Sequence, residues 1–521
     1  MTDCLVLIVG AGPTGLVLAL WLTRVGVRVR IVDKTAEPGT TSRAVAVQAR
    51  TLELYRQLDL SNPVVEDGVK VAAANLWVGG AKAARLPLGR MGERLSPFPY
   101  ALTYPQDAHE RLIIDRLEAL GVTVERQTEL VRFEQNHERV QAVLKRPGGT
   151  EEVCQAAYLA GCDGAHSTVR ESLTIGFPGG TYSGLFYVAD VDASGPTADG
   201  EIHVDLEEAD FLAVFPLKGT GRLRLIGPVR WEPHLEHREL TFGHVGERAI
   251  GNLKLSIAKV NWFSTYRVHH RVAARFREGR AFLLGDAAHV HSPVGGQGMN
   301  TGIGDAVNLA WKLAAVLNGT AHDSLLATYE PERISFARRL VATTDRAFTL
   351  VTRQGTFARW VRTKLVPRIA PLLFRLAPAR RFLFHTVSQI GVNYRNRPLS
   401  MGAAGAVHGG DRLPWVETDP GEDNFSPLAS LTWQVHVYGE ARRGLAEICA
   451  ELHLPLHLFE WQPEMRRAGL KRAAVYLVRP DGYVALADRY ADAERLRHYF
   501  RARGLGESLR AAAPSCSHPG R

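Results

Sequence analysis

The feature that most constrains this chain is an apolar run that ends in a glycine-rich turn near its N-terminus. Residues 4–10, Cys-Leu-Val-Leu-Ile-Val-Gly, have the pattern of a buried strand, and the turn Gly10-Ala-Gly-Pro-Thr-Gly15 follows at once. Glycines at these spacings permit a tight turn and bring backbone N–H groups close to a pyrophosphate at a helix N-terminus. The next residues predict a helix from Gly15 to Val25 and a strand from Val27 to Val32. The sequence therefore predicts a βαβ unit that binds a dinucleotide.

Asp33 closes the second predicted strand, twenty-three positions after Gly10, and Lys34 follows it. A carboxylate at this place can accept hydrogen bonds from the hydroxyl groups of a ribose. Two other interpretations stay open, namely a glycine turn in a nucleotide-free α/β domain and an Asp33 that only caps a helix or turn. The strand before the turn and the helix after it favour nucleotide binding.

Two later motifs again place an acidic residue beside glycine at a strand end. The first is Gly161-Cys-Asp163-Gly-Ala-His-Ser-Thr-Val-Arg170, which taken alone indicates only a turn. The second is Gly285-Asp286-Ala-Ala-His289, followed by Pro293-Val-Gly-Gly-Gln-Gly-Met-Asn-Thr-Gly302. A glycine-dense loop that enters a long helix can present the N–H groups of the helix N-terminus to an electron-rich group.

The chain of 521 residues is too long for one hydrophobic core. An α/β pattern over 1–181 changes to short alternating strands over 182–275 and returns over 276–400. Residues 401–510 follow as a further domain, which opens on a predicted linker of small residues at 401–406, and 511–521 predict a disordered tail. Because cofactor-type motifs lie on both sides of 182–275, we expect one α/β domain that is split in sequence by an inserted sheet.

Charge and cysteine content limit the classes of function. The net charge of +9 is concentrated between Arg346 and Gly410, where eleven Arg and Lys residues occur without any Asp or Glu. Such a segment favours a solvated helical face or a subunit contact over a surface for nucleic acid, anionic membrane or an acidic cofactor. Five cysteines without CxxC or zinc-type spacing predict a reduced, cytoplasmic protein without a metal site. No stretch has the flanks of a signal peptide or the length of a transmembrane helix, and we expect neither.

In their order and spacing, the three motifs resemble the FAD-binding monooxygenases of the phenol and aromatic-ring hydroxylase family. The resemblance extends to Leu326-Ala-Thr-Tyr-Glu-Pro-Glu-Arg333 and covers most of residues 1–400. It implies an α/β fold in which a Rossmann-like FAD-binding domain, split in sequence, carries an inserted β-sheet substrate domain. The segments Gly409–Pro414 and Tyr476–Val484 resemble the thioredoxin-like C-terminal domain of larger members. Since that region has no CxxC, a thiol-redox role is unsupported and packing or subunit contact is expected.

The resemblance also implies contacts to the cofactor, residue by residue. Asp33, where the family more often has Glu, would hold the adenosine ribose, and Lys34 is placed beside it. Arg43 resembles an arginine that approaches the FAD phosphates, Gln106 resembles a glutamine that contacts the cofactor, and Leu130 matches a backbone contact to adenine. The residues that would face the pyrophosphate are those of the turn, Gly10, Gly12, Pro13, Thr14 and Gly15.

The remaining implied contacts come from the second and third motifs. Asp163 belongs to a motif that serves architecture as much as nicotinamide docking, and Asp286 would bind the ribitol chain. The amides of Met299 and Asn300 would lie near O2 of the isoalloxazine. The loop residues against that ring system would be Pro293, Gly296, Gly298, Met299 and Asn300.

The family mechanism supplies the expected chemistry. NAD(P)H, with NADPH favoured, reduces FAD, O2 adds to form a flavin C4a-hydroperoxide, and this attacks a phenolic or polyketide-type aromatic substrate. Alternatives are an epoxidase or Baeyer–Villiger oxygenase, a flavin reductase or dehydrogenase without oxygen transfer, and a silent flavin-fold scaffold. We expect a small aromatic substrate, no nucleic acid and no membrane, and a homodimer is left open.

Catalytic side chains cannot be named from the sequence. His289 and His291 flank the flavin loop, but a lone histidine is more often structural than catalytic. Phe186, Phe211 and Phe215, on or near the inserted sheet, could line an aromatic pocket, although aromatic residues in strands ordinarily belong to the core.

Overall fold

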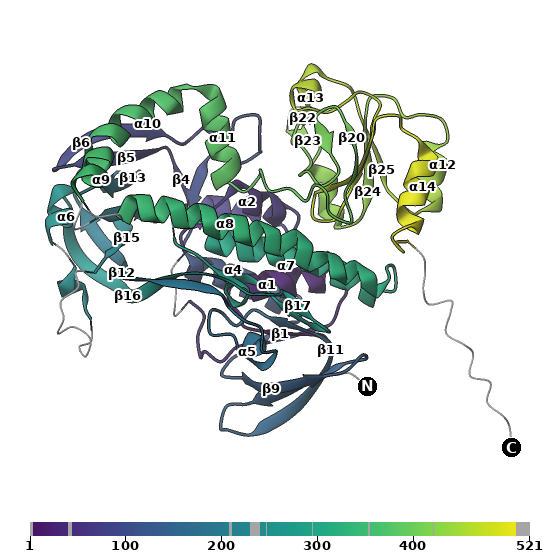
Figure 1. Ribbon diagram of the computed structural model, residues 1–521, viewed down its shortest axis with the longest axis horizontal. Coiled ribbons are helices and arrows are strands. Elements are labelled where there is room, and N and C mark those ends of the chain that lie inside the picture. Colours follow the sequence, from purple (N-terminus) through teal and green to yellow (C-terminus); the bar gives the residue numbers. More distant parts are fainter. Residues whose placement is uncertain are drawn as a thin grey trace. The chain divides into compact units, whose positions relative to one another are not determined.

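The computed structural model describes residues 4–39, 44–207, 211–229, 240–245, 247–293, 295–352, 355–419 and 421–506 (Figure 1). Arg43 and the predicted tail at 511–521 lie outside these residues. The chain divides into two compact units. Unit 1 comprises Met1–Leu20, Arg30–Ala306 and Arg333–Val392, and unit 2 comprises Trp21–Val29, Val307–Glu332 and Asn393–Arg521. Among the described residues, no helix has the length and apolar character needed to cross a membrane.

The first sheet of unit 1 is built around the apolar strand β1 (Cys4–Val9), which is buried along almost its whole length. β1 pairs in parallel with β11 (Glu151–Gly161), and β11 pairs in parallel with β18 (Ala281–Leu283). Strands from both sides of residues 182–275 therefore share one sheet. The other members are β2 (Val29–Val32), β8 (Val124–Glu125), β9 (Glu129–Gln135), β10 (Val140–Lys145) and β17 (Arg277–Glu278).

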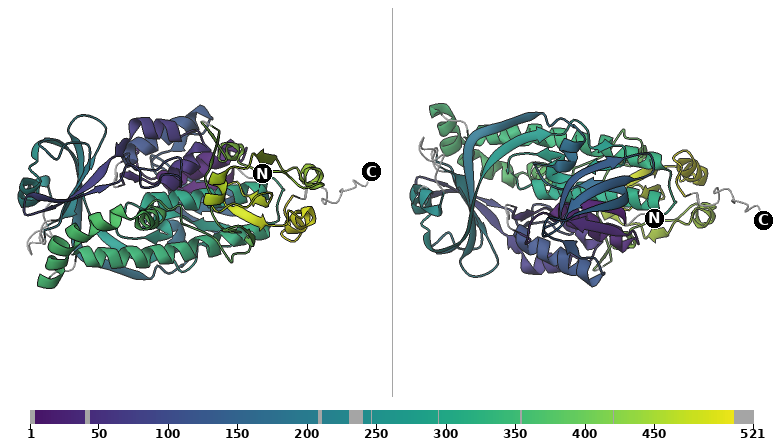
Figure 2. Two further views of the ribbon diagram at one scale, coloured as in Figure 1. Left: turned by 90° about the horizontal axis from the view of Figure 1, so that it is seen from above. Right: turned by 90° about the horizontal axis from the view of Figure 1, so that it is seen from below.

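The second sheet of unit 1 is mainly antiparallel, and its strands β12 and β16 form a long curved ribbon (Figures 1 and 2). Its order is β19 (His289–Val290), β16 (Ser256–Val272), β12 (Gly179–Ser194), β15 (Arg222–Pro228), β14 (Leu212–Pro216), β13 (Ile202–Asp205), β5 (Ala73–Val78) and β6 (Ala81–Pro87). Three strands, β5, β6 and β19, lie outside the predicted range of 182–275. The prediction omitted them because local alternation does not show which distant strand a segment will pair with.

Unit 1 also has a small three-stranded sheet, whose residues lie between the first and second motifs in sequence. Its strands are β3 (Ala46–Val47), β7 (Ala101–Thr103) and β4 (Val69–Val71). The helix α7 is buried along most of its length, because its apolar residues recur at helical spacing. The helices are α1 (Pro13–Arg24), α2 (Ala49–Arg56), α3 (Ser61–Asp67), α4 (Gln106–Ala119), α5 (Thr168–Ser172), α6 (Glu247–Asn252), α7 (Gly298–Leu317), α8 (Tyr329–Thr352), α9 (Thr356–Trp360), α10 (Val366–Arg375) and α11 (Ala377–Val387).

Unit 2 contains a six-stranded sheet with helices α12 (Leu445–Glu451), α13 (Pro463–Arg467) and α14 (Ala493–Arg501). The strand order is β21 (Val407–His408), β20 (Met401–Ala404), β27 (Val484–Asp488), β26 (Val475–Val478), β24 (Gln434–Tyr438) and β25 (Leu456–Phe459). The predicted linker at 401–406 is therefore wrong, since β20 pairs in parallel with β27. Its small residues serve close packing, because a β-carbon at Gly402 would lie 2.3 Å from the carbonyl oxygen of Ala487.

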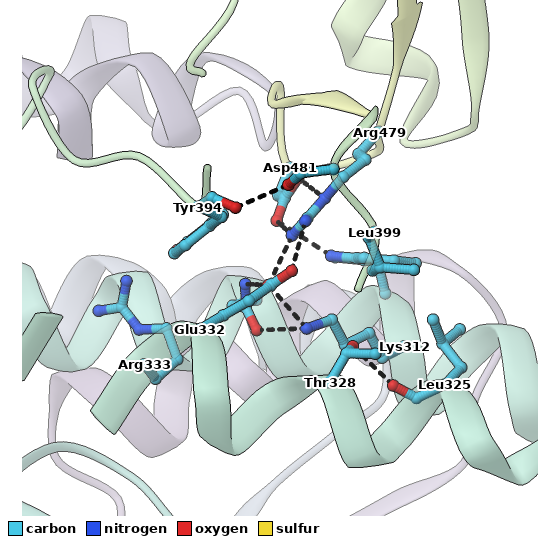
Figure 3. Close-up of polar contacts among 12 residues, drawn as sticks. Lys312, Leu325, Thr328, Glu332, Arg333, Tyr394, Leu399, Arg479 and Asp481 are labelled. Carbon is cyan, nitrogen blue, oxygen red and sulfur yellow. Dashed lines mark hydrogen bonds and ion pairs between the residues drawn. The ribbon is translucent and has the colours of Figure 1, made fainter. Parts of the chain in front are cut away.

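A cluster of buried charges stands in unit 2 (Figure 3). The guanidinium of Arg479 donates to both carboxylate oxygens of Glu332, at 2.8 and 3.0 Å, and its Nε donates to Asp481 at 3.0 Å. Lys312 Nζ donates to Glu332 at 2.9 Å and to Asn308 at 2.8 Å. Burial raises the pKa of Glu332, but the charges of Arg479 and Lys312 outweigh it, and the pKa falls to about 2. The cluster connects Arg479, in the turn between β26 and β27, to Glu332 of α8 and, through it, to Lys312 of α7.

Candidate functional site

A cavity of about 600 Å³ lies in unit 1, where the glycine-rich turn, the loop at 290–299 and the end of α11 meet. Apolar atoms make up most of its surface. Gly12, Pro13 and Thr14 of the first motif line it, as do the predicted residues Gln106 and Asp286. From the predicted flavin loop, Pro293, Gly296, Gly298 and Met299 line it as well.

The glycines of the first turn have two different environments. Gly10 has a φ of +102°, and a β-carbon there would lie 2.2 Å from the carbonyl oxygen of Cys162. A β-carbon at Gly15 would lie 2.0 Å from the carbonyl oxygen of Gly10, so both positions are closed by the protein itself. At Gly12, by contrast, a β-carbon would meet nothing within 4 Å. The open space lies at the N-terminus of α1, where backbone N–H groups favour an anionic group such as a pyrophosphate.

Asp33 lies beside this turn and fixes it. Its Oδ2 accepts a hydrogen bond from the amide of Ala11 at 2.6 Å, and its Oδ1 accepts from the amide and hydroxyl of Thr35 at 2.8 and 2.6 Å. The guanidinium of Arg126 is 3.8 Å away. Lys34 is exposed. Asp33 thus ties the end of β2 to the turn.

Asp286 belongs to a short 3₁₀ helix, Gly285–Ala287, directly after β18, and its side chain is exposed. The backbone before it turns sharply, with φ of +57° at Gly285. A β-carbon at Gly285 would lie 2.7 Å from Thr14 Oγ1, and one at Gly302 would lie 2.2 Å from the same atom. Glycine at both positions therefore lets the turn, α1 and α7 approach one another, which places Asp286 in the cavity wall.

A buried ion cluster that the sequence did not reveal supports this turn. Asp305, on α7, accepts hydrogen bonds from the amide of Gly285 at 3.0 Å, from His289 Nε2 at 2.8 Å and from Arg333 Nε at 2.5 Å. Burial raises the pKa of Asp305, but the charges of Arg333 and His289 lower it below its usual value. His289 therefore has a structural role. Together with Asp305 and Arg333 it holds the turn at Gly285.

The predicted flavin loop is held by side-chain amides. Asn300 Oδ1 accepts from the amide of Gln48 at 2.8 Å and from the hydroxyl of Thr51 at 2.7 Å. Its Nδ2 donates to the carbonyl oxygens of Ala46 and Gly296 at 2.9 and 2.8 Å. Gln48, which the sequence did not single out, donates to the carbonyl of Gly295 at 2.9 Å. The amide group of the Asn300 side chain is thus occupied by hydrogen bonds within the protein. A ligand at this loop would therefore meet backbone groups.

Three more predicted residues have structural partners. Gln106 Oε1 accepts from the amide of Ala44 at 3.2 Å and its Nε2 donates to Glu110 at 2.8 Å. Leu130 is buried in β9 and pairs with Leu144 of β10. Asp163 Oδ2 accepts from the amide of Val169 at 3.1 Å, and burial raises its pKa.

Arg170 joins the second and third motifs, and its backbone amide donates to the capping hydroxyl of Ser167 at 3.0 Å. Its guanidinium donates to the carbonyl of Ala287 at 3.0 Å and to that of Ala165 at 2.8 Å. The acidic motif around Asp163 thus has an architectural role in this structure.

His291 and Phe215 also line the cavity. His291 Nδ1 lies 2.8 Å from the carbonyl oxygen of Ser292, which can only accept, so Nδ1 carries the proton and Nε2 carries a lone pair. Burial lowers the pKa of His291 to about 4, and the ring is neutral near pH 7. Within the described residues, Nε2 has no hydrogen-bond partner. Phe186 instead packs against Phe348 in a small core cluster.

Comparison with known proteins agrees with this site. The family model described as an FAD binding domain matches residues 3–344. The chain is 36% identical over 439 residues to 6-methylpretetramide 4-monooxygenase of Streptomyces rimosus, which covers 80% of this chain and 74% of that protein. The structure of OxyS anhydrotetracycline hydroxylase from Streptomyces rimosus is 29% identical, with a TM-score of 0.77 over 97% of this chain and 99% of that one. A ternary complex of aklavinone-11 hydroxylase with FAD and aklavinone is 27% identical, with a TM-score of 0.76 over 97% and 100% of the two chains.

The family match begins before β1 and ends within α8, so it contains the glycine turn, the Asp286 turn and the loop that Asn300 shapes. The resemblance inferred from the three motifs is thereby confirmed. The chain is an FAD-dependent monooxygenase and belongs to the family of FAD-dependent aromatic hydroxylases.

Proposed function

We propose that this chain hydroxylates a phenolic, polycyclic aromatic substrate of the polyketide type and takes its electrons from NADPH. The observation that carries the proposal is the cavity of about 600 Å³ beside the flavin loop, whose surface is mostly apolar. The residues assigned to FAD line one part of this cavity, and apolar side chains that line another part, such as Phe215, Leu383 and Val387, suit an aromatic ligand. The relatives support the same class, because 6-methylpretetramide 4-monooxygenase, anhydrotetracycline hydroxylase and aklavinone-11 hydroxylase are named for polycyclic aromatic substrates.

The residues present fit an FAD. The open space beside Gly12 would take the pyrophosphate at the N-terminus of α1, and Asp33 would hold the adenosine ribose. Asp286 would bind the ribitol hydroxyls, and the loop that Asn300 shapes would offer backbone amides to the isoalloxazine. When bound, FAD supplies the redox and oxygen-transfer chemistry, while this chain binds, orients and excludes water. We therefore expect Asp286→Ala to be purified with little bound FAD, because it removes a charge-assisted hydrogen bond.

A direct test of the activity uses NADPH and NADH with a panel of phenols and polycyclic aromatic compounds. We expect a hydroxylated product from one of the polycyclic compounds, faster with NADPH, and one atom of labelled oxygen from O2 in that product. Oxidation of NADPH without any label in the organic product would instead indicate a reductase. A product with an inserted ring oxygen or an epoxide would move the assignment to the other oxygenases.

We also propose that substrate binding controls reduction of the flavin. The chain has one dinucleotide turn, and residues 295–302, which comprise the end of the loop and the start of α7, are dense in glycine, which leaves room for the flavin to change position. Anaerobic stopped-flow measurement should show slow reduction by NADPH alone and much faster reduction once a hydroxylated ligand is bound. Equal rates in the two conditions would exclude this control.

For the C-terminal part of unit 2 we propose a thioredoxin-like fold without thiol chemistry. Its strands β24 and β25 are parallel and joined by α12, and β26 and β27 continue as an antiparallel pair before α14. Cys449 is buried, and burial raises its pKa to about 11, so it is a poor nucleophile. Cys516 lies outside the described residues. Replacing both with Ser should leave the rate of hydroxylation nearly unchanged.

A further inference from the structure

Large apolar side chains are exposed on one segment of unit 1, from Phe357 to Phe382. Thirteen large hydrophobic residues are exposed among those that the structure describes, and eight of them lie in this segment. These eight are Phe357, Trp360, Leu365, Ile369, Leu372, Leu373, Leu376 and Phe382. Exposed apolar residues that are scattered singly need no explanation, but a contiguous set marks an interaction surface.

The helix α10 shows that this exposure is organised. Ile369, Leu372, Leu373 and Leu376 recur at the spacing that places residues on one face of a helix, and they are between 42% and 57% exposed. A surface helix normally turns such a stripe toward the core. Here α10 packs against β6 but leaves this stripe about half exposed, and Pro367 is its only buried residue among those described. Figure 1 shows α10 running above β5 and β6 at the edge of the unit.

Basic residues accompany the apolar stripe. Arg368 and Arg375, two turns apart on α10, are exposed, as are Arg359, Lys364 and Arg381 on either side of it. No acidic residue occurs between Arg346 and Gly410 to balance them. A helix with an apolar stripe and a neighbouring row of Arg and Lys has the composition of segments that lie in the interface of an anionic membrane.

We propose that helices α9, α10 and α11 form a docking surface for an anionic lipid bilayer. The proposal departs from the sequence-based expectation of a solvated face or subunit contact and of no membrane partner. A solvated face would not carry eight exposed apolar side chains. A two-fold contact centred on this segment would bring the two basic segments together, with no acidic residue in either to pair with them. A nucleic acid would satisfy the charge but not the apolar stripe.

The dimensions indicate that the helices lie on the bilayer. α10 has ten residues and α11 has eleven, or about 15 Å of helix each, against a hydrocarbon core of about 30 Å. The opposite side of α11 contributes Leu383, Phe384 and Val387 to the cavity. Docking would thus bring the cavity wall next to the lipid phase, where an apolar substrate would concentrate. Binding to lipid does not depend on the proposed substrate and can be tested without turnover.

The test is flotation of the purified full chain with vesicles of phosphatidylcholine, or of phosphatidylcholine and phosphatidylglycerol in equal parts. We expect binding to the mixed vesicles that weakens as salt is added, and little binding to the neutral ones. The double variant Leu372→Ser with Phe382→Ser should bind about tenfold more weakly or worse, since each side chain leaves the apolar phase. Arg368→Glu with Arg375→Glu should lose the preference for phosphatidylglycerol.

Matched controls come from exposed residues outside the segment. Leu458→Ser, on β25, removes a side chain that is 58% exposed, and Arg442→Glu with Arg443→Glu reverses two exposed arginines in unit 2. These variants should bind vesicles as the unaltered chain does. Equal binding to neutral and anionic vesicles, or equal losses in the control variants, would overturn the proposal. So would a chain that ignores vesicles but forms a dimer that Leu372→Ser with Phe382→Ser dissociates, because the surface would then belong to a second copy.

Discussion

Two buried carboxylates, one in each unit, each accept hydrogen bonds from two basic side chains, and their remaining partners distinguish the candidate site from the scaffold. Asp305 in unit 1 contacts His289 and Arg333, and Glu332 in unit 2 contacts Lys312 and Arg479. Asp305 also accepts a hydrogen bond from a backbone amide, that of Gly285, whereas the donors to Glu332 among the described residues are all side chains. The hydrogen bonds of Asp305 therefore fix the backbone at the turn proposed to contact FAD, while those of Glu332 join side chains of separate elements.

The largest effect should come from Glu332→Gln. It keeps the size of the side chain but leaves Lys312 and Arg479 buried without their shared anion, at a cost of about 3 to 5 kcal/mol. Unfolding by urea would measure this loss. Glu464→Gln, whose exposed partner is Arg467, is the control and should cost no more than about 1 kcal/mol. A loss of similar size in both variants would show that the buried cluster is not what stabilises unit 2.

Asp305→Asn should be somewhat less destabilising, by about 2 to 4 kcal/mol, because the amide can still accept from Gly285. It should differ from Glu332→Gln in a second property. We expect FAD to bind at least about tenfold more weakly to folded Asp305→Asn, since the neutral amide loses the ion pair with Arg333 that helps to hold the turn before Asp286. Folded Glu332→Gln should keep its FAD affinity, as measured by fluorescence titration of the apoprotein. The comparison between the units fails if both variants lose FAD equally.

The stability that Glu332 contributes should depend on pH in the acid range, because its pKa differs between the folded and the unfolded chain. The folded-state pKa is depressed from 4.5 to about 2, so the unfolded chain binds the proton first as pH falls. Stability from this residue is complete above pH 4.5 and is lost between 4.5 and 2. The unfolding free energies of the unaltered chain and of Glu332→Gln should therefore converge across this window. Parallel curves would show that Glu332 is not ionised in the folded chain.

Gly12→Ala should have the smallest effect on stability and a clear effect on the cofactor. Its β-carbon meets no protein atom within 4 Å, so the apoprotein should unfold as before. The same atom would enter the space assigned to the pyrophosphate and should weaken FAD binding by roughly tenfold. Gly15→Ala is the matched contrast, because its β-carbon would meet the carbonyl of Gly10 at 2.0 Å and should destabilise the apoprotein itself.

The sequence predicted those parts of the molecule that depend on local pattern. The first strand, the glycine turn, the helix after Asn300 and the Asp286 turn were all visible, because spacing along the chain determines them. What it missed depends on contacts between distant segments. Gln48 meets the flavin loop from almost 250 positions away, and Asp305 joins Arg333 only after α7 and α8 have packed. The glycines and alanines at 401–406 indicated a linker because small residues suit both loops and tightly packed strands.

Two sides of the cavity differ in what holds them in place, and this difference affects how enzymes of this kind can acquire new substrates. On the side proposed for the cofactor, hydrogen bonds of Asn300, Gln48 and Asp305 hold the backbone, and a substitution there would disturb the turn itself. The other side carries side chains of α11, such as Leu383 and Val387, which can change without altering any of those hydrogen bonds. Selection, or a laboratory library, could therefore reshape what the enzyme accepts at one wall while the oxidising machinery at the other is inherited intact.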